Sequence, residues 1–207
     1  MRGLPPRVSW LALGTAATGL LLGAIALALG MAEGAISLWG FGAACLLQVP
    51  PAMSVWQRLR DGLGNSGLER ERLTLRTVSH FLRLLALGMA LAAILALWED
   101  RALQVGLSAQ GLAALALGLQ AFLWWKKRGL VGIHPTLDLD AARARTLLDL
   151  AVLLLVSILL GHWFPWADGV GGLALALRLF LEGRTLGKST TLPAAACGGC
   201  GSGSGCG

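Results

Sequence analysis

The sequence predicts an all-α integral membrane protein with about six transmembrane helices, both termini in the cytoplasm and no soluble carboxyl-terminal domain. Three observations lead to this prediction: an apolar composition, six apolar runs of spanning length, and basic residues confined to alternate loops. Of 207 residues, 56% are hydrophobic and 14% are charged, whereas soluble domains carry about 25% charged residues. One soluble core of this size cannot bury so many apolar side chains, so lipid must cover the excess.

The apolar runs define the predicted helices. Crossing the hydrocarbon layer takes about 20 apolar residues in a helix, and such runs occupy residues 9–30, 35–56, 78–98, 103–125, 141–161 and 167–187. The first run is too long for the apolar part of a signal peptide, so we expect it to be retained. The second run should kink or end at Pro50 and Pro51, because proline lacks the backbone donor that a helix needs.

Basic residues in the loops predict the orientation. Cytoplasmic loops retain lysine and arginine during insertion. All the loop cations except Arg101 fall on one predicted side. The net charge of +6 is therefore a topology signal and not the basic face of a nucleic-acid-binding domain. The cations on the predicted cytoplasmic side are Arg2, Arg7, Arg58, Arg60, Arg70, Arg72, Arg76, Lys126, Lys127, Arg128, Arg184 and Lys188.

Charged residues inside the predicted spans are the first candidates for function, because a charge in the hydrocarbon layer is costly. Asp149 lies near the middle of the fifth span and Arg178 near the middle of the sixth. In one interpretation, Asp149 binds a cation or a proton at a polar site. In the other, Arg145, four residues earlier on the same helical face, or Arg178 pairs with Asp149 and holds the bundle together. Asp138 and Asp140 are expected to cap the fifth helix.

The last quarter of the chain resembles the fifth and sixth helices of cation diffusion facilitator transporters. The segment from Ala141 to Lys188 contains RTLLDLAVLLLVSILLGHWFPWADGVGGLALALRLFLEGRTL. The family has His or Asp, three residues and then Asp on the fifth helix, and an Asp at the start of the sixth. Asp149 matches the second fifth-helix ligand and Asp168 the opening Asp, whereas Arg145 stands in place of the first ligand.

The beginning of the chain is similar to the same family. GMAEGAISLWGFGAACLL resembles its first outer loop and second helix, where two aspartates four residues apart correspond here to Phe41 and Cys45. The resemblance implies an intramembrane site for a zinc-like ion, with Asp149 and Cys45 as ligands and Arg145 and Arg178 beside them. Such a site is atypical, because arginine cannot bind a metal and repels a divalent cation.

Other possible ligands lie outside the predicted spans. We divide the chain into a transmembrane domain at residues 1–192 and a flexible Gly- and Cys-rich cytoplasmic tail at residues 193–207. The thiols of Cys197, Cys200 and Cys206 could capture a soft metal ion, could be incidental, or could be acylated near the membrane. His162 and Asp168 could form a metal site at the outer mouth.

The resemblance implies a divalent metal cation transporter that exports Zn, Co, Cd or Fe in exchange for protons. The resemblance also implies a homodimer, and we expect the protein to lie in a bacterial inner membrane. The alternative is a non-transporting regulatory or structural membrane protein related to that family. We expect no enzyme and no resident cofactor, because the sequence contains no paired catalytic carboxylates, no Gly-rich phosphate loop and no Ser/His arrangement.

Overall fold

The computed structural model describes residues 6–60, 68–99, 106–132 and 135–189. All secondary structure in these residues is α-helical, which confirms the predicted all-α class. The helices are α1 (Pro6–Glu33), α2 (Ile36–Leu47), α3 (Val49–Arg60), α4 (Leu68–Trp98), α5 (Leu107–Arg128), α6 (Pro135–Gly161) and α7 (Ala167–Ser189).

Helix length and composition identify an integral, multi-pass membrane protein. Within the described residues, α1, α2 and α3 taken together, α4, α5 and α6 are long and apolar enough to cross a membrane. The remaining helix, α7, has 23 residues and is therefore about 34 Å long at 1.5 Å per residue, which also exceeds the hydrocarbon thickness of about 30 Å. Its interior carries the charged residues Arg178 and Glu182.

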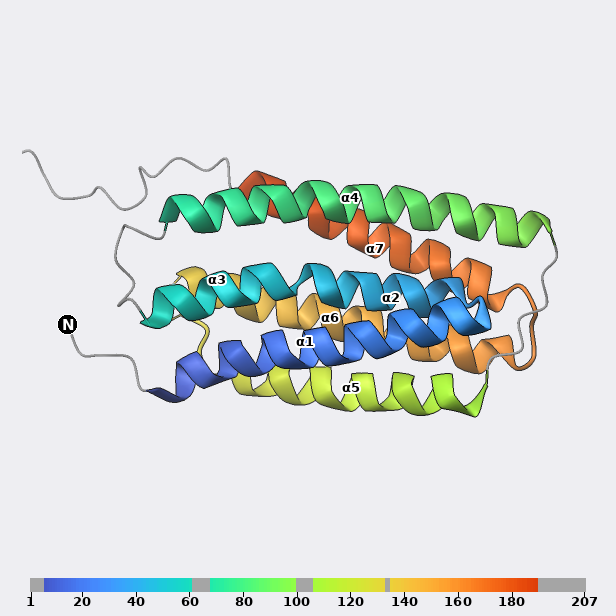
Figure 1. Cartoon of the computed structure of the whole chain (residues 1–207), viewed down its shortest axis with the longest axis horizontal. Helices are drawn as coiled ribbons and strands as arrows, with labels where there is room; N and C mark the ends of the chain where they lie inside the picture. The colour runs from blue at the N-terminus through green and yellow to red at the C-terminus, as the bar shows by residue number, and fades with distance from the viewer. Residues whose placement is uncertain (1–5, 61–67, 100–105, 133–134, 190–207) are drawn as a thin grey trace, which may run out of the picture.

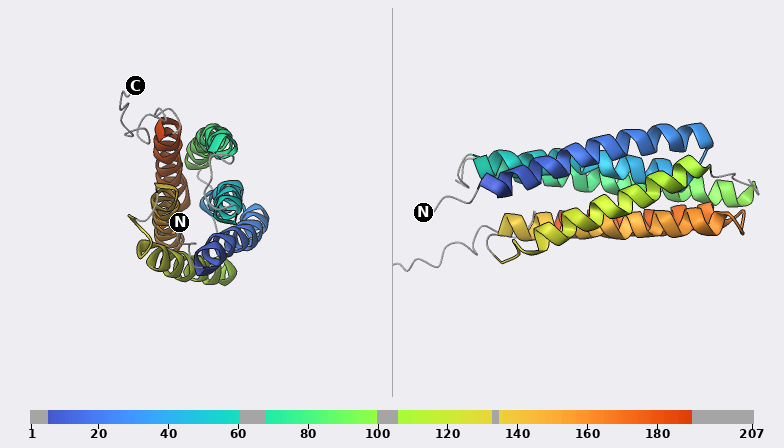
Figure 2. Two further views of the ribbon diagram at one scale, coloured as in Figure 1. Left: turned by 90° about the vertical axis from the view of Figure 1, so that its left-hand side faces the viewer. Right: turned by 90° about the horizontal axis from the view of Figure 1, so that it is seen from below.

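The helices lie side by side in an elongated antiparallel bundle, in which α2 and α3 together form the second membrane-spanning rod (Figure 1). We call its two ends the basic end, where α1 and α4 begin and α7 finishes, and the opposite end, where α1 finishes and α7 begins. Both terminal helices therefore have their outer ends at the basic end (Figures 1 and 2). Among the described residues, lysine and arginine lie in the half of each helix toward the basic end or, for Arg83 and Arg178, near its middle.

The second rod breaks where its prolines predict. Helix α2 ends at Leu47 and α3 begins at Val49, so that Gln48 stands at the junction. The backbone N–H of Gln48 donates to the carbonyls of Cys45 and Leu46. Beyond the two prolines, the N–H of Ala52 donates to the carbonyl of Gln48 at 3.2 Å. The rod therefore continues across the membrane, but its regular hydrogen bonding is interrupted near its centre.

Close helix contacts depend on glycine, as is common between transmembrane helices. Helices α1 and α2 meet at Gly23 and Gly42, where a Cβ atom on Gly42 would lie 2.8 Å from the carbonyl oxygen of Gly23. Helices α4 and α7 run together (Figure 1), and a Cβ atom on Gly183 would lie 3.0 Å from the carbonyl oxygen of Ser79. No larger side chain fits at either contact without movement of a backbone.

The apolar side chains divide between the core and the outer surface. The core includes the fully buried Phe41, Leu82, Met89, Leu150 and Leu175. Helix α4 also exposes a stripe of leucines three to four residues apart, which share one helical face. Lipid is the solvent for this stripe, whose members are Leu84, Leu87, Leu91 and Leu95.

Candidate functional site

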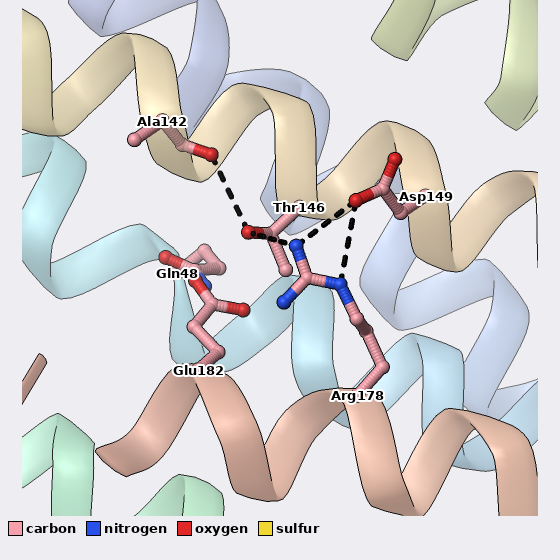
Figure 3. A network of polar contacts seen from close by, with 6 residues as sticks. All are labelled: Gln48, Ala142, Thr146, Asp149, Arg178 and Glu182. Atoms are coloured by element: carbon pink, nitrogen blue, oxygen red, sulfur yellow. Dashed lines mark hydrogen bonds and ion pairs between the residues drawn. The ribbon is translucent and has the colours of Figure 1, made fainter. Parts of the chain in front are cut away.

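Asp149 on α6 and Arg178 on α7 form an ion pair near the middle of the bundle. Arg178 Nη2 lies 2.9 Å from Asp149 Oδ2, and Arg178 Nε donates to the same oxygen at 3.3 Å. Nη2 also donates to Thr146 Oγ1 at 3.0 Å, one turn away on α6. Figure 3 shows the guanidinium reaching across from α7 to both side chains. The side chains of Arg178 and Asp149 remain 31% and 43% exposed, so the pair is only half-buried.

The predicted pairing of Arg145 with Asp149 does not occur. Arg145 is exposed, and no hydrogen bond or ion pair joins it to Asp149 in the described part of the chain. Arg143 is instead the buried arginine of α6. Two residues in a helix differ by about 200° in direction, so Arg143 and Arg145 face opposite ways. Arg143 therefore faces the interior, and Arg145 faces outward.

Glu182 and Gln48 form a second buried polar contact beside this pair. Glu182 follows Arg178 by four residues on α7 and therefore shares its helical face. Gln48 Nε2, at the junction of α2 and α3, donates to Glu182 Oε1 at 2.9 Å, and Figure 3 shows the two side chains facing each other. The remaining oxygens, Gln48 Oε1 and Glu182 Oε2, are buried and accept no hydrogen bond within the described structure.

Further buried charges lie toward the basic end. Lys127 on α5 forms an ion pair of 2.7 Å with Asp140 on α6, so Asp140 is not the helix cap that we expected. Asp138 instead accepts the N–H of Gly132 in the preceding turn at 2.7 Å. A cavity of about 10 Å³ lies between Gln48, Lys127, Asp140 and Arg143, which is close to the smallest volume that holds one water molecule.

Arg143 contributes the main unmet hydrogen-bonding capacity around this cavity. Its Nε and Nη2 atoms are buried and have no hydrogen-bond partner in the described residues. The nearby acidic groups include Asp140, Glu182 and Glu71. A polar network that serves only to hold helices together is normally satisfied, because an unpaired polar atom in a low-dielectric interior is costly. The cavity in this cluster is therefore a place for one water molecule at most.

The ligands implied by the resemblance are not assembled. Cys45 is fully buried among apolar side chains as a free cysteine. No group of three or more His, Cys, Asp or Glu side chains that could hold a metal ion occurs in the described residues. The predicted metal ligands Cys197, Cys200 and Cys206 lie outside the described residues.

Asp168, the other residue identified by the resemblance, caps a neighbouring helix. Its carboxylate accepts the N–H of Ile36 at 2.9 Å and that of Ser37 at 3.2 Å, and the Ser37 hydroxyl also donates to it. The cap position of α2 itself is Ala35, which offers no side-chain acceptor. His162 is exposed, and no hydrogen bond or ion pair joins it to Asp168 in the described structure. The two residues are therefore not brought together as an outer metal site.

Sequence reasoning missed Glu182, Arg143 and Gln48 as members of the cluster. The cost of intramembrane charge, which identified Asp149 and Arg178, applies equally to Glu182 within the predicted span 167–187. The same signal was available for Arg143. Gln48 carried a different signal, because a polar residue directly before two prolines stands where the helix must break. Comparison with known proteins adds no further assignment: the chain matches no family model and no curated protein.

Proposed function

We propose that this protein is a divalent cation transporter of the efflux type, with an atypical intramembrane site formed by Asp149, Glu182 and Gln48. The observation that carries the proposal is the pair of buried oxygens, Gln48 Oε1 and Glu182 Oε2, that accept no hydrogen bond within the described structure. Buried acceptors without donors are what a cation site presents when no ion is bound. The resemblance of α6 and α7 to cation diffusion facilitators supports the same class.

The chemistry of the cluster suits a hard or borderline cation. Carboxylate, amide and hydroxyl oxygens are available from Asp149, Glu182, Gln48 and Thr146, and such oxygens favour Mg-like and Mn-like ions over soft ones. Zn, Co and Fe also accept carboxylate ligands. The two carboxylates carry the charge that balances either one divalent cation or two protons, so the same groups could serve exchange of a metal ion for protons.

Arg178 would act as the gate of this site. Its guanidinium occupies Asp149 Oδ2, and its charge also acts on Glu182. A cation cannot share a carboxylate with arginine without strong repulsion in this environment. Ion binding therefore requires Arg178 to swing away from Asp149, and its half-exposed position allows that movement. In this proposal the described conformation is closed to ions.

Metal flux into proteoliposomes tests the proposal. Vesicles that contain the full chain are assayed with Mn²⁺, Zn²⁺, Co²⁺, Fe²⁺ and Cd²⁺ under an imposed proton gradient, beside empty vesicles. Asp149→Asn and Glu182→Gln should each reduce flux to the empty-vesicle level. Asp138→Asn is the matched control, because Asp138 is an exposed carboxylate on the same helix as Asp149, and it should leave flux unchanged. Flux that survives both site substitutions would overturn the proposed site.

A second candidate is a non-transporting regulatory or structural membrane protein. The specific observation in its favour is that Arg178 already neutralises Asp149, and that no group of three His, Cys, Asp or Glu side chains is assembled among the described residues. This candidate predicts no flux of any ion by the unaltered protein. It also predicts that neutralising Asp149 and Arg178 together affects stability less than neutralising Asp149 alone, because one substitution strands the opposite charge.

We place the transporter as a homodimer in a bacterial inner membrane with the basic end in the cytoplasm. The gathering of lysine and arginine at that end supports this orientation, because cytoplasmic segments are enriched in these residues. The direction of transport would then be from the basic end to the opposite end. The homodimer rests on the family resemblance alone.

A further inference from the structure

A large groove opens between the first half of α4 and the last third of α7, away from the Asp149 cluster. Its volume is about 920 Å³, which is ample for a phosphate headgroup and part of a chain. The basic residues that line it are Arg72, Arg76, His80, Arg83, Arg184 and Lys188. Glu69 is the only acidic residue among the described side chains that line the groove.

The positive charges of the groove lie close together, and the arginines among them form no ion pair with any described residue. Arg72, Arg76, His80 and Arg83 recur at intervals of three or four residues and so share one face of α4. Like charges at this spacing destabilise a helix unless a counter-charge is present. Arg72, Arg76 and Arg184 form no ion pair with any described residue. The lining of the groove therefore favours binding of an anion.

Arg83 is held at the inner end of the groove with donor capacity to spare. Its Nη2 donates to the carbonyl of Gly183 at 3.1 Å, whereas its Nε is buried and has no hydrogen-bond partner in the described structure. Glycine on α7 makes room for it, since a Cβ atom on Gly187 would lie 2.5 Å from Arg83 Nη2. This fixed guanidinium can position an anion and not merely attract it.

The walls of the groove favour a lipid over a soluble anion. Leu73 and Phe180 contribute apolar surface beside the arginines. The leucine stripe of α4, which begins at Leu84, continues from the groove toward the opposite end and is covered by lipid chains. The groove itself lies in the half of the bundle toward the basic end, where headgroups are found. Basic pockets between transmembrane helices at this level suit anionic phospholipid headgroups.

We propose that this groove binds the headgroup of an anionic phospholipid. The phosphate pairs with Arg76, Arg83 and Arg184, and one acyl chain follows the leucine stripe of α4. The bound lipid neutralises the arginines and ties α4 to α7 at the basic end.

The test measures binding of phosphatidylglycerol and phosphatidylcholine to the full chain in detergent micelles by native mass spectrometry. Phosphatidylglycerol should bind in preference to phosphatidylcholine. Arg76→Gln together with Arg184→Gln should weaken phosphatidylglycerol binding about tenfold or more. The matched control is Arg70→Gln with Arg145→Gln, which removes two exposed cations that do not line the groove and should change binding less than twofold. Unaltered unfolding curves in phosphatidylcholine show that both double variants are folded.

Three outcomes would overturn the proposal. Equal weakening by the two double variants would mean that general surface charge, and not the groove, attracts the lipid. Equal binding of phosphatidylcholine and phosphatidylglycerol would exclude recognition of an anionic headgroup. Displacement of phosphatidylglycerol by an equal concentration of glycerol 3-phosphate, which has the phosphate without acyl chains, would assign the groove to a soluble anion.

Discussion

Gln48 donates a hydrogen bond to Glu182 across 134 residues of sequence and links the broken second rod to α7. Gln48 stands at the junction of α2 and α3, and its side chain is buried in the bundle. Gln48 and Glu182 are both buried, so bulk solvent does not offer either side chain a replacement partner.

Removal of Gln48 should therefore destabilise the protein. Gln48→Leu keeps the approximate volume but leaves Glu182 without its donor, which should lower the free energy of unfolding by about 1–3 kcal/mol. Unfolding in mixed micelles of mild and denaturing detergent measures the change. The double substitution Gln48→Leu and Glu182→Leu should recover part of the loss, because it removes both partners. If the double variant lost as much free energy of unfolding as the two single variants lose together, this account would be contradicted.

Asp168 should be required for the start of α2. Asp168→Ala removes the acceptor for the N–H groups of Ile36 and Ser37, and loss of a helix cap costs about 1–2 kcal/mol. Hydrogen exchange should accelerate at these two amides in particular, since α2 has no side-chain cap of its own. Asp138→Ala, which removes an exposed carboxylate elsewhere, is the control. Unchanged protection of Ile36 and Ser37 in Asp168→Ala would rule out the capping role.

The positions of the helices were predictable because the thickness of the hydrocarbon layer sets the length of each apolar run. The break at Gln48 was predictable for a similarly local reason, since Pro50 and Pro51 withhold backbone donors wherever they occur. The role of Asp168 was not predictable in this way. Its partners, Ile36 and Ser37, lie more than 130 residues earlier, and only the packing of α7 beside α2 brings them together.

The candidate site, too, could be predicted from the sequence only in part. That Asp149 would meet an arginine follows from the cost of burying a charge, but the choice between Arg145 and Arg178 depends on the rotation of α6. Arg143 faces the interior, whereas Arg145 lies on the outer side of α6 and makes no contact with Asp149 in the described structure, although the two residues share a helical face. Helical spacing identifies which residues share a face, whereas neighbouring helices decide which face is inside.

The glycine contact between α1 and α2 should be intolerant of substitution. A Cβ atom at position 42 would lie 2.5 Å from the backbone nitrogen of Leu27, so Gly42→Ala should separate the helices and destabilise the protein by about 1–3 kcal/mol. Gly88→Ala is the matched control, since nothing lies within 4 Å of a Cβ atom there, and it should be neutral or stabilising by about 0.5–1 kcal/mol. Equal unfolding curves for the two variants would refute the contact.

The orientation of the bundle can be tested by thiol labelling in sealed cells with a membrane-impermeant reagent. Cysteines introduced at Glu33, Glu99 and Trp166, near the opposite end, should react from outside. A cysteine at Gly129, at the basic end, should react only after the membrane is opened, because the basic end is expected in the cytoplasm. The reverse pattern would invert the bundle and the proposed direction of transport.

The two arginine ion pairs should differ in their contribution to stability because they differ in burial. Arg58 contacts both Glu71 and Thr136, and the Arg58 and Glu71 side chains are only 7% and 8% exposed. Arg58→Met strands the Glu71 carboxylate in the interior and should cost about 3–5 kcal/mol. Arg178→Met strands Asp149 near the middle of the membrane, where an unpaired carboxylate costs about 2.5–3.5 kcal/mol. Because the Asp149 side chain is 43% exposed, it can reorient toward water, so the loss should be smaller than that for Arg58→Met.

Double-mutant cycles separate each pair energy from other effects of the substitutions. The cycle of Arg58→Met with Glu71→Gln should give a larger coupling than that of Arg178→Met with Asp149→Asn, when both are measured by unfolding in mixed micelles. This order matters for the proposed gate, because Arg178 can leave Asp149 only if their pairing is weak enough to be reversed. A coupling for Asp149 and Arg178 as large as that for Arg58 and Glu71 would identify a structural lock and exclude Arg178 as a moving part.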